Sequence, residues 1–177
     1  NRYINKMYEL DFKFPNKIGI VANDAGAANL ILGWLKNNNS LNYFFCLTGP
    51  AKDIFEKENL LTSNFTIEEI ISNCNLIISG TSFDSTLEHL ARLEAKKAKI
   101  LSIAVIDHWV NYEIRFIRNN RKVLPDIIWV FDEYAKTKAK KLFKKTKVHK
   151  IKNFYIDEIV NKIKTLESDN IYENKRN

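Results

Sequence analysis

The stretch KIGIVAN, residues 17–23, decides the fold class of this 177-residue chain. Its apolar run is continuous rather than alternating and ends in turn residues, which is typical of a strand buried on both faces of a parallel sheet. The loop DAGAAN follows at residues 24–29, and apolar residues then recur at helical spacing between Leu30 and Leu35. The first regular unit is therefore a strand, a loop of small residues and a helix.

The same alternation continues along the chain. Further strands are predicted at residues 43–48, 76–80, 100–106, 127–131 and 148–151. Helices are predicted at residues 52–59, 66–72, 85–97, 133–144 and 156–166. Two of these helices begin with the spacing of a capping box, Thr66 with Glu69 and Ser85 with Glu88. Strands that alternate with helices predict an α/β fold, a three-layer α/β/α Rossmann-like arrangement with an open, mostly parallel sheet of five or six strands.

Length and composition predict one domain. A chain of 177 residues with 45% apolar residues builds one sizeable core. We expect an N-terminal arm at residues 1–16, the α/β domain at residues 17–166 and a polar C-terminal tail at residues 167–177. No apolar run approaches the roughly 20 residues of a membrane span, and the first residues do not resemble a signal peptide, so we expect a cytoplasmic protein.

The cysteine and histidine content predicts neither a disulfide framework nor a metal site. Cys46 and Cys74 both lie in or beside apolar segments, where they are expected to be small core residues in a reducing compartment. The three histidines are scattered and no paired cysteine spacing is present. We therefore predict no metal and no cofactor.

The net charge of +7 allows anionic partners. Nine lysines crowd the segment from Lys136 to Lys152, and the simplest interpretation is a solvated helix face. Peripheral contact with an anionic membrane surface is the sharper alternative. Nucleic-acid binding is not expected, because the segment lacks the interleaved Arg and aromatic residues of a known binding module.

Ligands of open parallel sheets bind beyond the carboxyl ends of the strands, where all strand-to-helix loops gather. This rule selects four loops: residues 23–28, 80–85, 107–115 and 132–134. In the first, small residues around Gly26 let backbone N–H groups approach a phosphate, whereas Asp24 suits a hydroxyl or an amine. The alternative is an ordinary helix cap by Asn23 or Asp24. Asp132 and Glu133 are interpreted as a cap rather than as ribose ligands.

The second loop places several hydroxyl and N–H groups at the positive end of a helix. Gly80, Thr81, Ser82 and Ser85 are its candidate ligand-binding residues, and the predicted ligand is an anion such as a diphosphate. The alternative is a cap in which Ser85 accepts a hydrogen bond from the Glu88 N–H.

The third loop, DHWVNY at residues 107–112, crowds polar and aromatic side chains behind an apolar strand. Trp109 or Tyr112 is expected to stack on a base or sugar. His108 is a candidate general base or hydrogen-bond donor, and Arg115 a candidate phosphate ligand. The alternative is a buried ion pair between Asp107 and Arg115, with the aromatic residues in the core.

Two of these loops carry a family resemblance. The stretch GTSFDSTLE, residues 80–88, resembles the donor loop of glycosyltransferases of the two-Rossmann-domain (GT-B) type, which binds the nucleotide diphosphate. The stretch DHWVN, residues 107–111, falls where that family often carries an acidic-polar pair followed by Asn that contacts the donor sugar. The wider layout is similar to uncharacterised proteins associated with bacterial surface-polysaccharide synthesis. A complete enzyme of this type has two such domains, so the resemblance implies a partner subunit or a second copy.

The resemblance leads to one hypothesis, a glycosyltransferase-like domain that binds a nucleotide sugar in bacterial surface glycan synthesis. Ser82 and Ser85 would hold the diphosphate, His108 and Asn111 would contact the sugar, and Asp24 would be the acceptor-side base. Whether the domain is an enzyme by itself stays open. One alternative is a non-catalytic binding or scaffolding module that recognises an anionic sugar or a partner protein. A hydrolase using Ser82 or Ser85 with His108 is the other, and no nucleophile-elbow pattern supports it.

Overall fold

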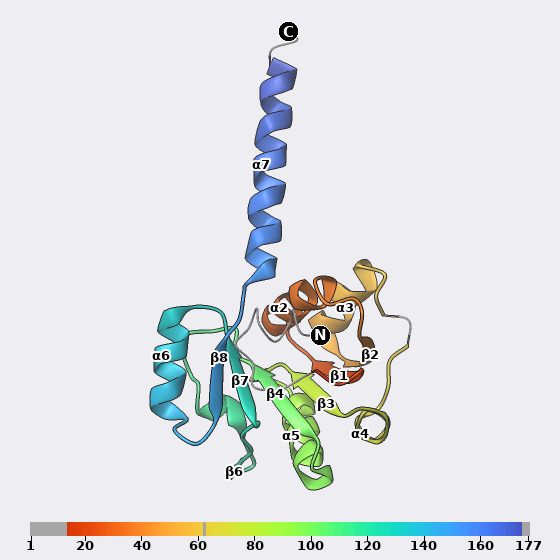
Figure 1. The fold of residues 1–177 in the computed structure, drawn as a ribbon, viewed down its shortest axis with the longest axis vertical. Helices are drawn as coiled ribbons and strands as arrows, with labels where there is room; N and C mark the ends of the chain where they lie inside the picture. Colours follow the sequence, from red (N-terminus) through yellow and green to blue (C-terminus); the bar gives the residue numbers. More distant parts are fainter. Residues whose placement is uncertain (1–13, 62, 175–177) are drawn as a thin grey trace.

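A six-stranded sheet forms the centre of the molecule (Figure 1). The structure, a computed structural model, describes residues 14–61 and 63–174. The strand order is β2-β1-β3-β4-β7-β8, and each neighbouring pair is parallel. The strands are β1 (Lys17–Ala22), β2 (Asn42–Leu47), β3 (Leu76–Ser79), β4 (Leu101–Val105), β7 (Ile127–Val130) and β8 (Lys147–Lys150). The predicted α/β class with a mostly parallel sheet is therefore confirmed.

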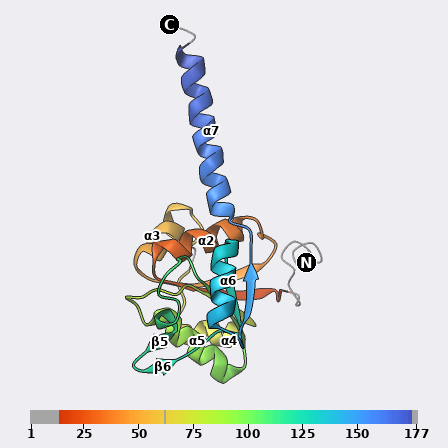
Figure 2. The ribbon, with the colours of Figure 1, turned by 90° about the vertical axis from the view of Figure 1, so that its left-hand side faces the viewer.

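Helices cover both faces of this sheet, which makes three layers. The covering helices are α2 (Ala25–Lys36), α3 (Gly49–Lys57), α4 (Ile67–Asn73), α5 (Leu87–Ala98) and α6 (Glu133–Leu142), and a further helix, α7 (Phe154–Asn174), follows β8. One face packs on α2 and α3, whose buried residues share a cluster with Ile18, Ile20 and Trp129. The other face packs on α4, α5 and α6 through two further clusters. Figure 2 shows α6 in front of the sheet at its β8 edge.

The direction of winding reverses once in this sheet. From β1 the chain moves outward to β2, returns past β1 to β3, and then continues to β8 on the far edge. The switch point therefore lies between β1 and β3, where the loops after both strands meet at their carboxyl ends.

The strand interiors explain why the apolar runs are continuous. In β1, Ile18 and Ile20 belong to the cluster under α2, while Val21 belongs to the cluster under α4 and α5. Gly19 packs on the second face, where an added Cβ would lie 2.4 Å from Ile70 Cγ2. Phe14, Trp34 and Trp129 pack together with ring centroids 5.2–6.1 Å apart. Cys46 and Cys74 are buried and free.

Three features depart from the predicted elements. Helix α7 runs to Asn174, beyond Leu166, and leaves the domain as a single projecting helix (Figure 1). A 3₁₀ turn η1 (Ile114–Phe116) and a hairpin of β5 (Ile117–Arg118) and β6 (Arg121–Lys122) were not predicted. The hairpin turns through Asn119 and Asn120, both with positive φ, as a tight primed turn requires. Among the described residues, no helix combines the length and the apolarity needed to cross a bilayer.

Helix α7 is anchored to the domain through α2, and Gly33 provides the close approach. A Cβ at Gly33 would lie 2.8 Å from the backbone N of Tyr155 and 3.3 Å from Phe154 Cβ. Gly33→Ala is therefore expected to lower the free energy of unfolding by about 1–3 kcal/mol, despite the better helix propensity of alanine. Urea denaturation measures the effect. Asn29→Ala in the same helix is the control, and a Gly33→Ala protein as stable as this control would contradict the close contact.

Candidate functional site

A pocket of about 280 Å³ opens beyond the carboxyl ends of β4 and β7. Of the residues predicted to bind ligand, Gly26, Asp107, His108 and Trp109 line it. The remaining lining comes from α2, the end of β4, the segment from the end of β7 into α6, and the start of α7: Asn29, Leu30, Ile106, Phe131, Asp132, Ala135, Asn153, Tyr155 and Ile156. Residues of four separate loops or helices thus meet at one place, the edge of the sheet that the parallel-strand rule selects.

Asp107 is the best-defined side chain of the pocket. Its Oδ1 lies 3.3 Å from Nη1 of Arg115, and both side chains are only about a tenth exposed. The same Arg115 nitrogen donates to the carbonyl oxygen of Thr81 at 3.0 Å, which joins the loops after β3 and β4. A Cβ on Gly26 would come within 1.9 Å of Asp107 Oδ2, so only glycine leaves room for this carboxylate. Arg115 is therefore engaged in a largely buried ion pair.

Trp109 is held at the mouth of the pocket by two contacts to α6. Its ring N–H donates to Asp132 Oδ2 at 2.7 Å, while Lys138 Nζ donates to the Trp109 carbonyl oxygen at 2.5 Å. Asp132 in turn caps α6, because its Oδ1 accepts from the Ala135 N–H at 2.7 Å. Trp109 nevertheless stays 59% exposed, so much of its ring surface is accessible to a ligand.

The other residues of the third loop take different positions. His108 is exposed and lines the pocket. Asn111 is exposed with φ of 60°, a left-handed turn position that asparagine tolerates. This turn carries Tyr112 into the core cluster under α6, where burial raises the pKa of its hydroxyl to about 12. Neither Asn111 nor Tyr112 lines the pocket.

The hydroxyl groups of the loop after β3 form hydrogen bonds with other groups of the protein. Thr81 is fully buried and donates to the Val105 carbonyl oxygen at 2.9 Å. Ser82 Oγ accepts from Asn23 Nδ2 at 3.3 Å, and Ser85 Oγ accepts from the Leu87 N–H at 3.1 Å. In the part of the chain that the structure describes, neither serine hydroxyl contacts His108. The geometry adds no support to the hydrolase alternative.

Arg118 holds this loop from outside, and sequence reasoning missed it. Its guanidinium donates to the carbonyl oxygens of Ser82, Phe83 and Ser85, and it lies over the Phe83 ring at 5.8 Å. These three residues of the loop lie 33–36 positions from Arg118 in the chain, so no local pattern connects them with it. The signal that was present is the pair Asn119-Asn120, which predicts a tight hairpin and thereby a fixed Arg118.

Glu88 differs from its predicted role. The predicted capping box between Ser85 and Glu88 is wrong, because α5 begins at Leu87 and its N-cap, Thr86, makes no side-chain cap. Glu88 Oε1 instead accepts from the Asn23 N–H at 3.0 Å, which ties α5 to the end of β1. Gly80 makes room for this carboxylate, since an added Cβ would lie 2.9 Å from Oε1. Burial raises the pKa of Glu88 to about 7.

Arg92, four residues after Glu88 in α5, is a second buried ionisable side chain. Arg92 is fully buried and donates to Ser79 Oγ at 3.1 Å and to the Gly80 carbonyl oxygen at 2.9 Å. Burial lowers the pKa of this guanidinium to about 10, which still leaves it charged at neutral pH. Buried Arg92 thus holds the end of β3, and the partly exposed Arg118 holds the loop that follows this strand.

Asp24 caps α2. Its Oδ1 accepts from the Ala27 N–H at 3.0 Å, and it does not line the pocket. Partial burial raises the pKa of its carboxyl, the Ala27 N–H lowers it, and the nearby Asp107 raises it further. Of the two interpretations of this loop, the helix cap by Asp24 is the one that the structure shows. The Asp24 carboxylate therefore already occupies the N-terminus of α2.

Neither a protein-family model, nor a curated protein, nor a solved structure matches this chain. The resemblance to GT-B glycosyltransferases therefore stays a prediction that rests on residues 80–88 and 107–111. Within the described ranges, no group of three or more His, Cys, Asp or Glu side chains is arranged to hold a metal ion.

Proposed function

We propose that this protein binds a nucleotide sugar as a glycosyltransferase-like domain of bacterial surface glycan synthesis. The observation that carries the proposal is the lining of the 280 Å³ pocket, which combines Asp107, Asp132 and His108 with an exposed Trp109. Carboxylate, amide and imidazole groups match the hydroxyl groups of a sugar, and an indole ring provides an apolar surface for its face. The volume lies just below the roughly 300–1,000 Å³ of typical ligand pockets, so it suits one sugar ring rather than a whole nucleotide sugar.

The phosphates are assigned to the neighbouring loop after β3. No Lys or Arg lines the pocket, and two carboxylates do, so a diphosphate is disfavoured inside it. In this loop, the carbonyl oxygens of Ser82, Phe83 and Ser85 accept hydrogen bonds from Arg118. The N–H groups of residues 82–85 donate no hydrogen bond within the described residues, and they precede the N-terminus of α5. Free N–H groups that lie just before a helix N-terminus, where the helix dipole is positive, are suited to an anion.

Calorimetric titration with a panel of nucleotide sugars tests the proposal. We expect heat of binding with at least one of them, and Trp109→Ala should weaken that binding roughly tenfold or more because the ring loses its contact with the sugar. Leu90→Ala is the control, since Leu90 is an exposed apolar residue of α5 that lies neither in the pocket nor in the loop after β3. No heat with any nucleotide sugar, or equal losses in both variants, would contradict the proposal.

A second candidate, a non-catalytic binding module, is favoured by one observation. Asp107 and Asp132, the carboxylates that line the pocket, and Asp24, the predicted base, are all held in structural contacts: Asp24 and Asp132 cap helices, and Asp107 pairs with Arg115. A base for an acceptor hydroxyl must be free to take up a proton. Binding of a nucleotide sugar without transfer or hydrolysis, measured by release of the nucleoside diphosphate, would favour the module over the enzyme.

A further inference from the structure

The net charge of this protein is concentrated in one segment. Residues 134–156 contain nine lysines and no Asp or Glu. The rest of the chain carries 19 Lys and Arg against 21 Asp and Glu, so the segment accounts for the whole of the net charge of +7. The segment comprises most of α6, the turn after it, β8 and the start of α7.

The fold places the elements that carry these lysines together at one edge of the sheet. Helix α6 and the edge strand β8 lie next to each other, and Figure 2 views this side directly. Some lysines have partners: Lys150 pairs with Glu133, Lys152 pairs with Asp157, and Lys138 bonds to Trp109. Five others make no ion pair within the described residues: Lys136, Lys140, Lys141, Lys144 and Lys145. The last four of these are exposed, so their charge faces the solvent.

The same surface carries apolar groups. Tyr134 is 65% exposed and Leu142 is 38% exposed at the two ends of α6. Together with Thr137, Lys138 and Lys141 they line a shallow hollow of about 390 Å³. Lys140 and Lys144 border a second hollow of about 490 Å³ on the side toward β8. Aromatic and aliphatic groups flanked by lysines are typical of helices that lie in a membrane interface.

We propose that the face formed by α6 and β8 docks on an anionic membrane surface, and we name it the lysine face. The unpaired lysines would contact phosphate groups of the lipids, while Tyr134 and Leu142 would reach the boundary between headgroups and acyl chains. Nucleic acid fits this face less well, because residues 134–156 contain no Arg and no row of aromatic side chains on which bases would stack. The inference rests on charge and exposure and does not depend on what the pocket binds.

Docking on this face would bring the pocket near the membrane. Asp132 and Ala135, at the start of α6, line the pocket, and Lys138 in the middle of the helix holds Trp109. The ligand site and the lysine face therefore share one helix.

Vesicle co-sedimentation of the full chain tests the proposal. We expect binding to vesicles of equimolar phosphatidylcholine and phosphatidylglycerol, little binding to phosphatidylcholine alone, and a loss of binding as the salt concentration rises. The test variant changes Lys140, Lys141, Lys144 and Lys145 to Gln. Each lysine is worth about fivefold in binding, so the variant should bind roughly several hundredfold more weakly.

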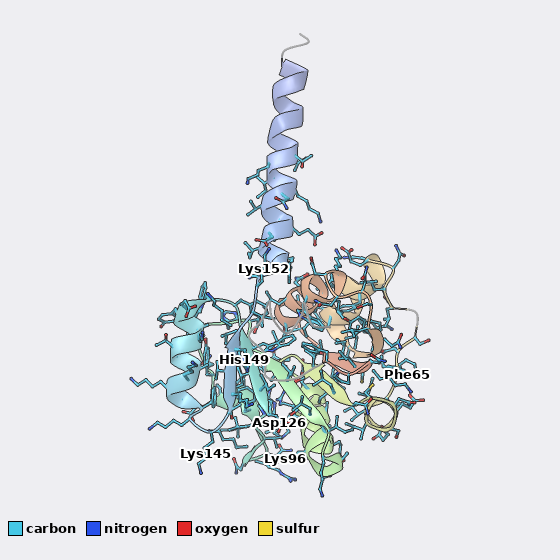
Figure 3. The ribbon with its side chains drawn as sticks, viewed as in Figure 1. Phe65, Lys96, Asp126, Lys145, His149 and Lys152 are labelled. Carbon is cyan, nitrogen blue, oxygen red and sulfur yellow. The ribbon has the colours of Figure 1, made fainter. Side chains whose placement is uncertain are left out.

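A matched control removes the same charge elsewhere. It changes Lys17, Lys57, Lys96 and Lys164 to Gln, four exposed lysines outside the lysine face. Figure 3 labels Lys145 beyond the end of α6 and Lys96 at the end of α5. Circular dichroism verifies that both variants are folded, and Tyr134→Ser, which leaves the charge unchanged, tests the apolar contribution.

Three outcomes would overturn the proposal. The first is that the wild-type protein does not sediment with the anionic vesicles. The second is that the control variant loses as much binding as the test variant, which would make the effect one of net charge alone. The third is that a single-stranded oligonucleotide binds the lysine face at a salt concentration that releases the vesicles, which would assign the face to nucleic acid.

Discussion

Arg115→Leu is expected to lower the free energy of unfolding by about 3–5 kcal/mol. The substitution leaves the Asp107 carboxylate nearly buried and without its partner at 3.3 Å. It also removes the hydrogen bond to the Thr81 carbonyl oxygen, which joins the loops after β3 and β4. Because Asp107 lines the pocket, the variant should also weaken binding of any ligand there. Chemical denaturation and calorimetric titration measure the two effects.

A double variant separates the cost of an unpaired Asp107 carboxylate from the loss of the other contacts of Arg115. Asp107→Asn together with Arg115→Leu removes the stranded charge, so it should recover a part of the stability that Arg115→Leu alone loses. Ligand binding should not recover, because the pocket no longer carries the carboxylate. An Arg115→Leu protein that loses less than about 1 kcal/mol would show that the ion pair is solvated, and the close packing of Asp107 on Gly26 would then need revision.

The second large effect concerns the pH dependence of stability, through Glu88. Burial raises the pKa of this carboxyl to about 7 in the folded protein, from 4.5 in an exposed glutamate. The folded state therefore binds more protons than the unfolded state between these two pH values. Stability contributed by protonated Glu88 is complete below about pH 4.5 and is lost as the pH rises through 7. The loss amounts to roughly 3 kcal/mol.

Glu88→Gln should remove this dependence. A glutamine keeps the carbonyl-type oxygen that accepts from Asn23 but does not ionise, so the wild-type protein should lose stability relative to the variant as the pH rises from 4.5 to 7. Glu94→Gln, at a partly exposed position of the same helix, measures the effect of removing a carboxylate from α5. If both variants follow the same pH profile, Glu88 does not carry the effect.

The buried charges have a common position in the fold. Glu88 and Arg92 come from α5, and Arg115 comes from the turn after β4, yet all three bond to the ends of strands or the loops that follow them. Backbone groups at strand ends have no sheet partner and must be satisfied by other groups. Buried side chains that do this at several positions hold the loops around the pocket in a defined arrangement, which favours binding of a rigid ligand.

The position of the candidate site in the fold could be predicted from the sequence, but the full set of residues that line the pocket could not. Gly26, Asp107, His108 and Trp109 follow or adjoin apolar strands, and the parallel-strand rule places them at one edge. Asn111, Tyr112 and Arg115 belong to the same loop, and only its turn through a left-handed Asn111 sends Tyr112 and Arg115 into the interior. Asp132 lies in a loop that the same rule selects and is interpreted from the sequence as a helix cap, whereas in the structure it both caps α6 and lines the pocket. Asn29 and Asn153 line the pocket from other segments, and nothing in their local sequence distinguishes them from ordinary helix residues.

The sequence by itself determined the strands, most of the helices and the edge at which loops gather. The apolar run of residues 17–22 is visible without knowledge of its partners, because a strand buried on both faces is apolar along its whole length. The capping box of Thr66 with Glu69 joins residues only three positions apart. The tertiary structure alone decided that Glu88 accepts a hydrogen bond from Asn23, 65 residues away, and that Arg118 donates hydrogen bonds to the loop after β3. Those contacts depend on which strands lie side by side, and the strand order follows from packing of the whole sheet.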